Sequence, residues 1–259
     1  MAKKRILYID PVGEKPAVQA SLRAYLSAAA APDSAEIEVT SLGQAPPSLE
    51  TYYYLALIAP ELLRRIKLAE REGYDAAIIG CFCDPALDAA KEICERMVVV
   101  GVMEAALQIA SLLAPRFTIL AAQHKSVQDF RDNLGKYGLT GRLASFRSLD
   151  IPANDLLNDP ALVAQRMREE ITWAIEEDQA EAIILGCTLQ LGHYQQLQRE
   201  FGLPVIDAAL AGLKVAEHLI AVREACGWYT SKISSYAPVP QGELAAWGLA
   251  QHYGVADLF

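Results

Sequence analysis

Short apolar runs alternate with longer amphipathic stretches along the chain. The run Arg5-Ile6-Leu7-Tyr8-Ile9 predicts a buried first strand that ends at Asp10-Pro11, and an amphipathic helix is expected over residues 18–30. A second helix, which Pro60 starts or interrupts, is expected to end near Gly73. Further strands are expected at 37–39, 76–80, 98–100, 117–120, 182–185 and 204–206, with helical patterns between them. This alternation is typical of parallel α/β sheets.

The sequence also contains an internal repeat. Residues 75–81, Asp-Ala-Ala-Ile-Ile-Gly-Cys, align without gaps with residues 181–187, Glu-Ala-Ile-Ile-Leu-Gly-Cys. A second matched piece follows each segment, at 102–106 and at 205–209. Because the order, residue type and approximate spacing of these pieces agree, we predict two equivalent α/β halves.

The repeat divides the chain into two domains. We expect residues 1–113 and 210–259 to form the first α/β domain, which carries Cys81, and residues 114–209 to form the second, which carries Cys187. The predicted fold class is therefore α/β, with two pseudo-symmetric parallel-sheet domains and the active site in the cleft between them.

Composition narrows the classes of partner. The formal net charge is −9 and no stretch concentrates Lys and Arg, which argues against nucleic acid as a partner. The apolar run behind the basic start of the chain stops at Asp10, too early for a signal peptide or a membrane span. We expect a cytoplasmic protein that acts on a small-molecule substrate, forms a homo-oligomer and has no membrane or nucleic-acid partner.

Five cysteines occur, an odd number that favours free thiols in a reducing compartment. Cys81 and Cys83 lie two positions apart, but structural zinc usually needs a second pair at matching spacing, so we expect no metal. We interpret Cys94 and Cys226 as small apolar core residues.

The other two cysteines both follow a buried strand. In parallel α/β sheets the site lies beyond the carboxyl ends of the strands, where Gly80-Cys81 and Gly186-Cys187 are expected. Asp84-Pro85 predicts a helix N-cap followed by proline at the first helical position. That helix N-terminus would lower the pKa of the Cys81 thiol and offer N–H donors to an anion, and Thr188 would cap similarly after Cys187.

Two thiols on opposite sides of one carbon atom suit stereoinversion. One cysteine as thiolate removes a proton, N–H donors stabilise the enolate-like carbanion, and the opposite thiol returns a proton to the other face. Each such donor is typically worth about 3 kcal/mol. The roles of Glu104 and Asp207, helix caps or site residues, stay open at this point, as does His193, an auxiliary acid or an ordinary helix residue.

Three segments, residues 80–90, 101–106 and 185–187, resemble the aspartate/glutamate/hydantoin racemase superfamily, and within it the hydantoin and allantoin racemases. The likeness runs from the first strand to about Leu219. The resemblance implies two α/β domains related by a pseudo-dyad, no metal or cofactor, and catalytic cysteines at Cys81 and Cys187.

The chain departs from this branch at positions that matter for the substrate. Asp10-Pro11-Val12 stands where the branch has Asn-Pro-Asn, and Ala121-Ala122-Gln123 where it commonly has Thr-Thr. Thr188-Leu189-Gln190 follows the second cysteine, where small residues are usual. We expect the substrate to be a hydantoin or a related small molecule. The predicted substrate-binding residues are Asp10, Phe82, Cys83, Glu104, Gln123 and Thr188.

Other activities occur on similar sequences. Arylmalonate decarboxylases use a single cysteine in the second half, and the presence of Cys81 argues against that chemistry. Maleate isomerase-like members use two cysteines, one of which attacks carbon. A non-catalytic ligand-binding protein is the alternative from a different class, and it would bind ligand without exchanging protons.

Overall fold

The computed structural model describes residues 3–31, 35–240 and 242–252. The parts of the predicted first domain at 1–2, 32–34, 241 and 253–259 lie outside the described residues.

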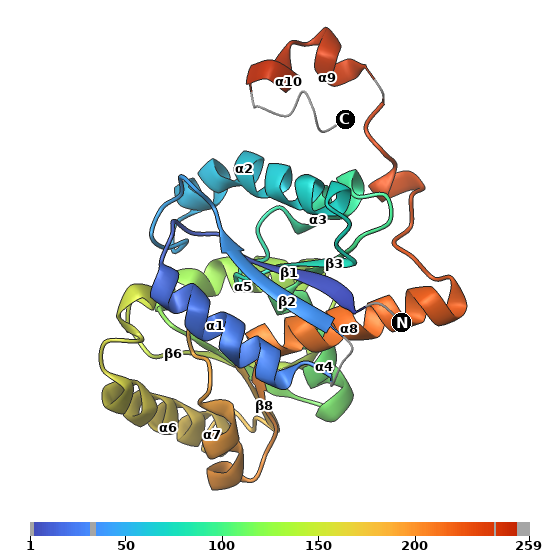
Figure 1. Cartoon of the computed structure of the whole chain (residues 1–259). Coiled ribbons are helices and arrows are strands. Elements are labelled where there is room, and N and C mark those ends of the chain that lie inside the picture. The colour runs from blue at the N-terminus through green and yellow to red at the C-terminus, as the bar shows by residue number, and fades with distance from the viewer. Residues whose placement is uncertain (1–2, 32–34, 241, 253–259) are drawn as a thin grey trace.

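Two separate four-stranded parallel sheets form the frame of the molecule (Figure 1). The first has the order β2-β1-β3-β4 and the second β6-β5-β7-β8, so equivalent strands occupy equivalent places. The predicted α/β class and the repeat of the fold are thus confirmed. The strands are β1 (Lys4–Asp10), β2 (Ala35–Ser41), β3 (Ala76–Ile79), β4 (Val98–Gly101), β5 (Phe117–Ala121), β6 (Leu143–Ser148), β7 (Ala182–Leu185) and β8 (Val205–Asp207).

Helices connect the strands and cover both faces of each sheet. Pro60 lies inside the second helix and does not start it. The helices are α1 (Pro16–Ala29), α2 (Tyr52–Arg71), α3 (Leu87–Ile93), α4 (Val102–Leu113), α5 (Val127–Lys136), α6 (Pro160–Glu176), α7 (Tyr194–Phe201), α8 (Ala208–Cys226), α9 (Glu243–Ala246) and α10 (Leu249–His252).

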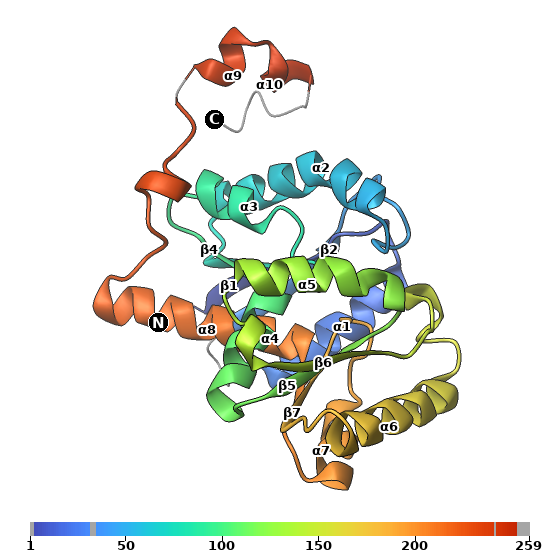
Figure 2. The same cartoon turned by 180° about the vertical axis from the view of Figure 1, so that it is seen from behind.

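The largest core cluster lies between the two sheets. It joins apolar side chains of β3 and β7, such as Ile78 and Ile184, to Leu107 of α4 and Leu213 of α8. Helix α4 follows the first sheet but also contacts β7 and β8, whereas α8 follows the second sheet and packs against β3 and β4 (Figure 2). Two smaller clusters cover the outer faces under α2 and α6. The two halves therefore share one central core.

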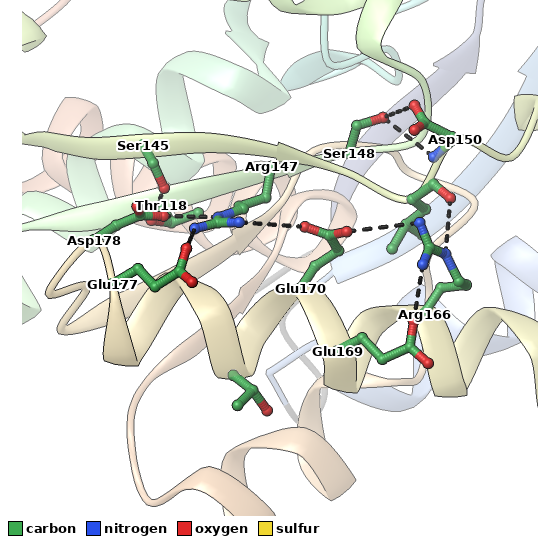
Figure 3. Close-up of polar contacts among 12 residues, drawn as sticks. Thr118, Ser145, Arg147, Ser148, Asp150, Arg166, Glu169, Glu170, Glu177 and Asp178 are labelled. Carbon is green, nitrogen blue, oxygen red and sulfur yellow. Dashed lines mark hydrogen bonds and ion pairs between the residues drawn. The ribbon is translucent and has the colours of Figure 1, made fainter.

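Strand β6 was not predicted from the sequence. All six of its residues are half-buried, and it pairs with the rest of the sheet on one side only. Charged contacts tie this edge strand to the end of α6: Arg147 forms ion pairs with Asp178, Glu177 and Glu170 (Figure 3). Because half-exposed edge positions accept polar side chains, the segment lacks the apolar run that marked the other strands.

Candidate active site

A cavity of ≈ 90 Å³ opens at the carboxyl ends of β1, β3, β5 and β7, and residues from both halves line it. Cys81 and Cys187 both line this cavity, and each is half-buried. Four of the predicted substrate-binding residues line it as well: Asp10, Phe82, Cys83 and Thr188. The volume is below the roughly 300–1,000 Å³ of pockets that take drug-sized ligands, which favours a small substrate.

The two cysteines leave their strands through the same backbone arrangement. Gly80 N donates to Ile9 O at 2.8 Å, and Gly186 N donates to Leu120 O at 2.9 Å. A Cβ atom on Gly80 would lie 2.8 Å from Ile9 O and would also overlap the ring of Tyr8; one on Gly186 would lie 3.0 Å from Leu120 O. Glycine is needed at both points because the neighbouring strand approaches so closely.

Gly80→Ala is expected to lower the free energy of unfolding by about 1–3 kcal/mol, because the added methyl group has no room. Displacement of Cys81 should also reduce turnover. Urea denaturation measures the first effect, and Gly43→Ala is the matched control because a Cβ atom there would meet nothing within 4 Å. Equal stability of the two variants would contradict the close packing described for Gly80.

Each cysteine is followed by a tight turn. Asp84 N donates to Cys81 O at 2.9 Å, and Gln190 N donates to Cys187 O at 3.0 Å. Within the described part of the chain, the N–H groups of Phe82, Cys83 and Thr188 donate to no protein acceptor. All three residues line the cavity, and backbone N–H groups at a cavity wall are donors of the kind that stabilise a bound anion.

The cysteine thiols differ in their electrostatic surroundings. Burial raises the pKa of Cys187 to about 12; the N–H of Leu189 opposes this, and the negative charges of Cys81, Glu50 and Asp10 add to it. A hydrogen bond to Cys81, together with burial, raises the pKa of Cys83 well above its ordinary value. Cys187 and Cys83 are therefore protonated thiols at neutral pH.

The helix cap predicted at Asp84-Pro85 is wrong. Helix α3 begins at Leu87, and Asp84 adopts a left-handed backbone conformation with φ 44°. Its carboxylate turns instead to the start of α4, where it accepts from Met103 N (3.0 Å) and Glu104 N (2.8 Å). No helix begins directly after Cys81, so the predicted interaction between a helix N-terminus and the Cys81 thiol is absent.

Asp84 also joins the two halves. Tyr137, directly after α5, donates from its hydroxyl to Asp84 Oδ2 at 2.7 Å, and burial raises the pKa of Asp84 to about 7 although its hydrogen bonds oppose this. The second half has a similar contact from a different position of the repeat: Tyr25 of α1 donates to Asp207 Oδ2 at 2.7 Å, and Asp207 caps α8 through Leu210 N. Asp207 is thus a helix cap.

Thr188 does not cap a helix either, since α7 begins at Tyr194. Its hydroxyl donates to Gly80 O at 3.2 Å, which links the turn after Cys187 to the strand exit before Cys81. Thr188 therefore contributes to the contact between the halves at the cavity wall.

Glu104 and Gln123, predicted to bind substrate, are not among the described residues that line this cavity. Glu104 forms an ion pair with Lys91 at 2.6 Å, and its backbone N–H is held by Asp84. Gln123 is half-buried directly before a short 3₁₀ helix, His124–Ser126. His193 lies at the start of α7, where burial lowers its pKa, and it does not line the cavity either.

Two charged residues of the cavity were missed from the sequence. Lys15 Nζ donates to Pro47 O at 2.7 Å and to Asn154 Oδ1 at 2.5 Å, and Glu50 Oε1 accepts from Ala153 N at 3.1 Å. The contacts with Asn154 and Ala153 join loops more than 100 positions apart in sequence, so no local motif marks them. They close the cavity on the side of the loops.

Neither a metal-binding cluster nor a membrane-spanning helix occurs among the described residues. No group of three or more His, Cys, Asp or Glu side chains is arranged to hold a metal ion. In the same part of the chain, none of the helices has the length and apolar character that a bilayer crossing requires.

Comparison with known proteins identifies the family of the chain. Residues 16–216 match the family model described as Asp/Glu/Hydantoin racemase. The chain is 36% identical over 207 residues to a hydantoin racemase of Pseudomonas sp. (strain NS671), covering 80% of this chain and 81% of that protein.

Solved structures of allantoin racemases are similar throughout. The enzyme from Klebsiella pneumoniae superimposes with a TM-score of 0.85 at 32% identity, covering 94% of this chain and 98% of that one. The enzyme from Pseudomonas fluorescens gives a TM-score of 0.83 at 28% identity, covering 92% and 97%. The chain therefore belongs to the Asp/Glu/Hydantoin racemase family and is an isomerase of the racemase type.

Proposed function

We propose that the protein is a cofactor-independent racemase in which Cys81 and Cys187 exchange protons with opposite faces of one carbon atom. The observation that carries the proposal is that two cysteines, from equivalent positions of the two halves, line a single small cavity. Cysteines that serve only to pack the core are not expected to line one cavity from equivalent positions of the two halves.

The surroundings of Cys187 suggest how the roles divide. Burial raises the pKa of Cys187, so we assign it the role of the thiol that donates a proton, which leaves the role of the base to Cys81. Cys83 stays protonated and in contact with Cys81, so it serves as a hydrogen-bond donor and not as a base.

In the proposed reaction the two cysteines carry out both proton transfers at carbon. The Cys81 thiolate takes the proton from the carbon next to the carbonyl, and the electron pair of the C–H bond moves into the carbonyl to form an enolate. The free N–H groups of the two turns stabilise its oxygen. Cys187 gives its proton to the opposite face, which forms the new C–H bond and leaves Cys187 as thiolate. Cys81 then releases its proton to water and Cys187 takes one up from water, which restores the starting state.

We propose a hydantoin or a related cyclic ureide as the substrate. The relatives at 36% identity are hydantoin racemases, and the volume of the cavity suits a small ring. The carbon of such a ring that bears the side chain lies next to a carbonyl, so loss of its proton gives the enolate that this site is suited to stabilise.

The test is to incubate single enantiomers of 5-substituted hydantoins, allantoin and acidic amino acids in heavy water, and to follow α-proton exchange together with optical rotation. Exchange with loss of rotation of the cyclic ureides is expected. Release of CO₂ from arylmalonates would favour the decarboxylase, cis-trans conversion of maleate would favour the isomerase, and tight binding without exchange would favour a non-catalytic protein.

The predicted domain bounds stay a proposal. The packing of α8 against β3 and β4 supports the return of the chain to the first domain after residue 209. A cytoplasmic homo-oligomer also remains a prediction. The five free cysteines support the cytoplasmic location. Large apolar side chains at the surface, among them Leu112, Trp228 and Ile233, support the homo-oligomer.

A further inference from the structure

Asp10 differs from the other buried carboxylates. Four acidic side chains of the described residues are buried: Asp10, Asp84, Glu170 and Asp207. Asp84 and Asp207 accept N–H and tyrosine hydroxyl donors, and Glu170 lies between Arg147 and Arg166. Asp10 is 9% exposed, yet its carboxylate has neither a hydrogen bond nor an ion pair with any described residue.

An unpartnered buried carboxylate has a large desolvation cost, so it is expected to have a donor in the working state of the protein. Lys15, whose charge acts on Asp10, donates instead to Pro47 O and Asn154 Oδ1. Because Asp10 lines the cavity, the donor has to enter there.

The position of Asp10 indicates which part of a ligand it meets. It ends β1, directly after Ile9, whose carbonyl holds Gly80, the residue before Cys81. The carboxylate is therefore a neighbour of the thiolate proposed to reach the reacting carbon. In a cyclic ureide of the hydantoin type, that carbon is bonded to a carbonyl on one side and to a ring N–H, at N1, on the other.

We propose that Asp10 is a specificity-determining residue that accepts the N1–H of a cyclic ureide. This inference rests on the proposed function for its ligand. The enolate oxygen then lies toward the N–H groups of Phe82, Cys83 and Thr188, and the N–H edge lies toward Asp10. The site selects rings with an unsubstituted N1, since an N-methyl group there would leave the carboxylate buried and unpaired.

The selectivity should depend on pH. Burial raises the pKa of Asp10 to about 6, and Lys15 opposes the rise. Below this pH the carboxyl is protonated and the charged acceptor is lost, so binding should weaken as the pH falls through about 6. The ionisable groups that face Asp10 from the surrounding elements are Tyr8 on β1, Lys15, Glu50, Cys81 and Cys187.

The experiment measures binding by calorimetry and α-proton exchange in heavy water for a 5-substituted hydantoin and its N1-methyl and N3-methyl forms. Asp10→Leu removes the acceptor but nearly keeps the shape of the side chain. If the N1-methyl group weakens binding only through a steric clash, the variant should therefore show the same loss as the wild-type protein. Glu14→Gln removes a charge from an exposed residue of the same loop and should change nothing. Asp10→Asn tests whether the pH dependence near 6 disappears.

We expect the wild-type protein to lose about 10- to 100-fold in affinity for the N1-methyl ring, and little for the N3-methyl ring. Asp10→Leu should bind the parent ring about 10- to 100-fold more weakly and should distinguish the parent from the N1-methyl ring much less. Equal wild-type binding of the parent and the N1-methyl ring, or the same penalty in Asp10→Leu, would overturn the inference.

The two proposals can fail separately. If the wild-type protein binds the parent ring through Asp10 but exchanges no proton, the racemase proposal fails and the role of Asp10 stands. If it racemises both rings equally well, Asp10 has no such role although the racemase proposal stands. Failure to bind any of the three rings would also overturn the inference.

Discussion

Cys187→Ser is expected to lower the rate of racemisation by about 1,000-fold, because a serine hydroxyl is a much poorer proton donor and base than a thiol. Optical rotation of either enantiomer measures the loss. Cys81 remains in this variant, so the enantiomer whose proton faces Cys81 should still exchange with heavy water, with retention of configuration. Cys81→Ser should lose racemisation to the same extent and should not exchange that enantiomer.

Cys226→Ser is the control for these variants. The interpretation of Cys226 as a core residue is wrong, because it is exposed at the end of α8, whereas Cys94 is buried as expected. It should racemise at the wild-type rate. Near-normal racemisation by either Cys81→Ser or Cys187→Ser would show that the protein does not invert its substrate through two thiols.

Asp84→Ala is expected to reduce the free energy of unfolding by about 3 kcal/mol, because three donors lose their acceptor inside the protein. These are Met103 N, Glu104 N and the hydroxyl of Tyr137. Urea or thermal denaturation measures the effect. Asp159→Ala removes an exposed cap from α6 and should cost only about 1 kcal/mol. A loss no larger than that of Asp159→Ala would contradict the assigned role of Asp84.

Much of the fold was predictable because its strands carry strong local signals. The segments around Ile78 and Ile184 are apolar on both faces, as the central strands of parallel sheets require, and their likeness to each other predicted the repeat. Strand β6 gives no such signal because it lies at an edge and its polar side chains are satisfied by α6.

The candidate site was predictable in part for the same reason. Cys81 and Cys187 follow strands, and strand ends meet at one edge of an α/β fold. Asp84 was assigned to the wrong helix because an Asp-Pro pair looks the same whether its carboxylate caps the next helix or a more distant one. Lys15 and Glu50 reach the cavity from loops, and their partners near Asn154 lie in the other half of the chain.

The exchange of helices between the halves, with α4 against the second sheet and α8 against the first, has a consequence for the origin of the fold. Neither half would be stable alone, because the apolar surface that the other half covers would be exposed to water. An ancestor with a single half would therefore have had to pair with an identical copy before the genes fused. Either half of the present chain, expressed alone, should aggregate unless the other half is supplied.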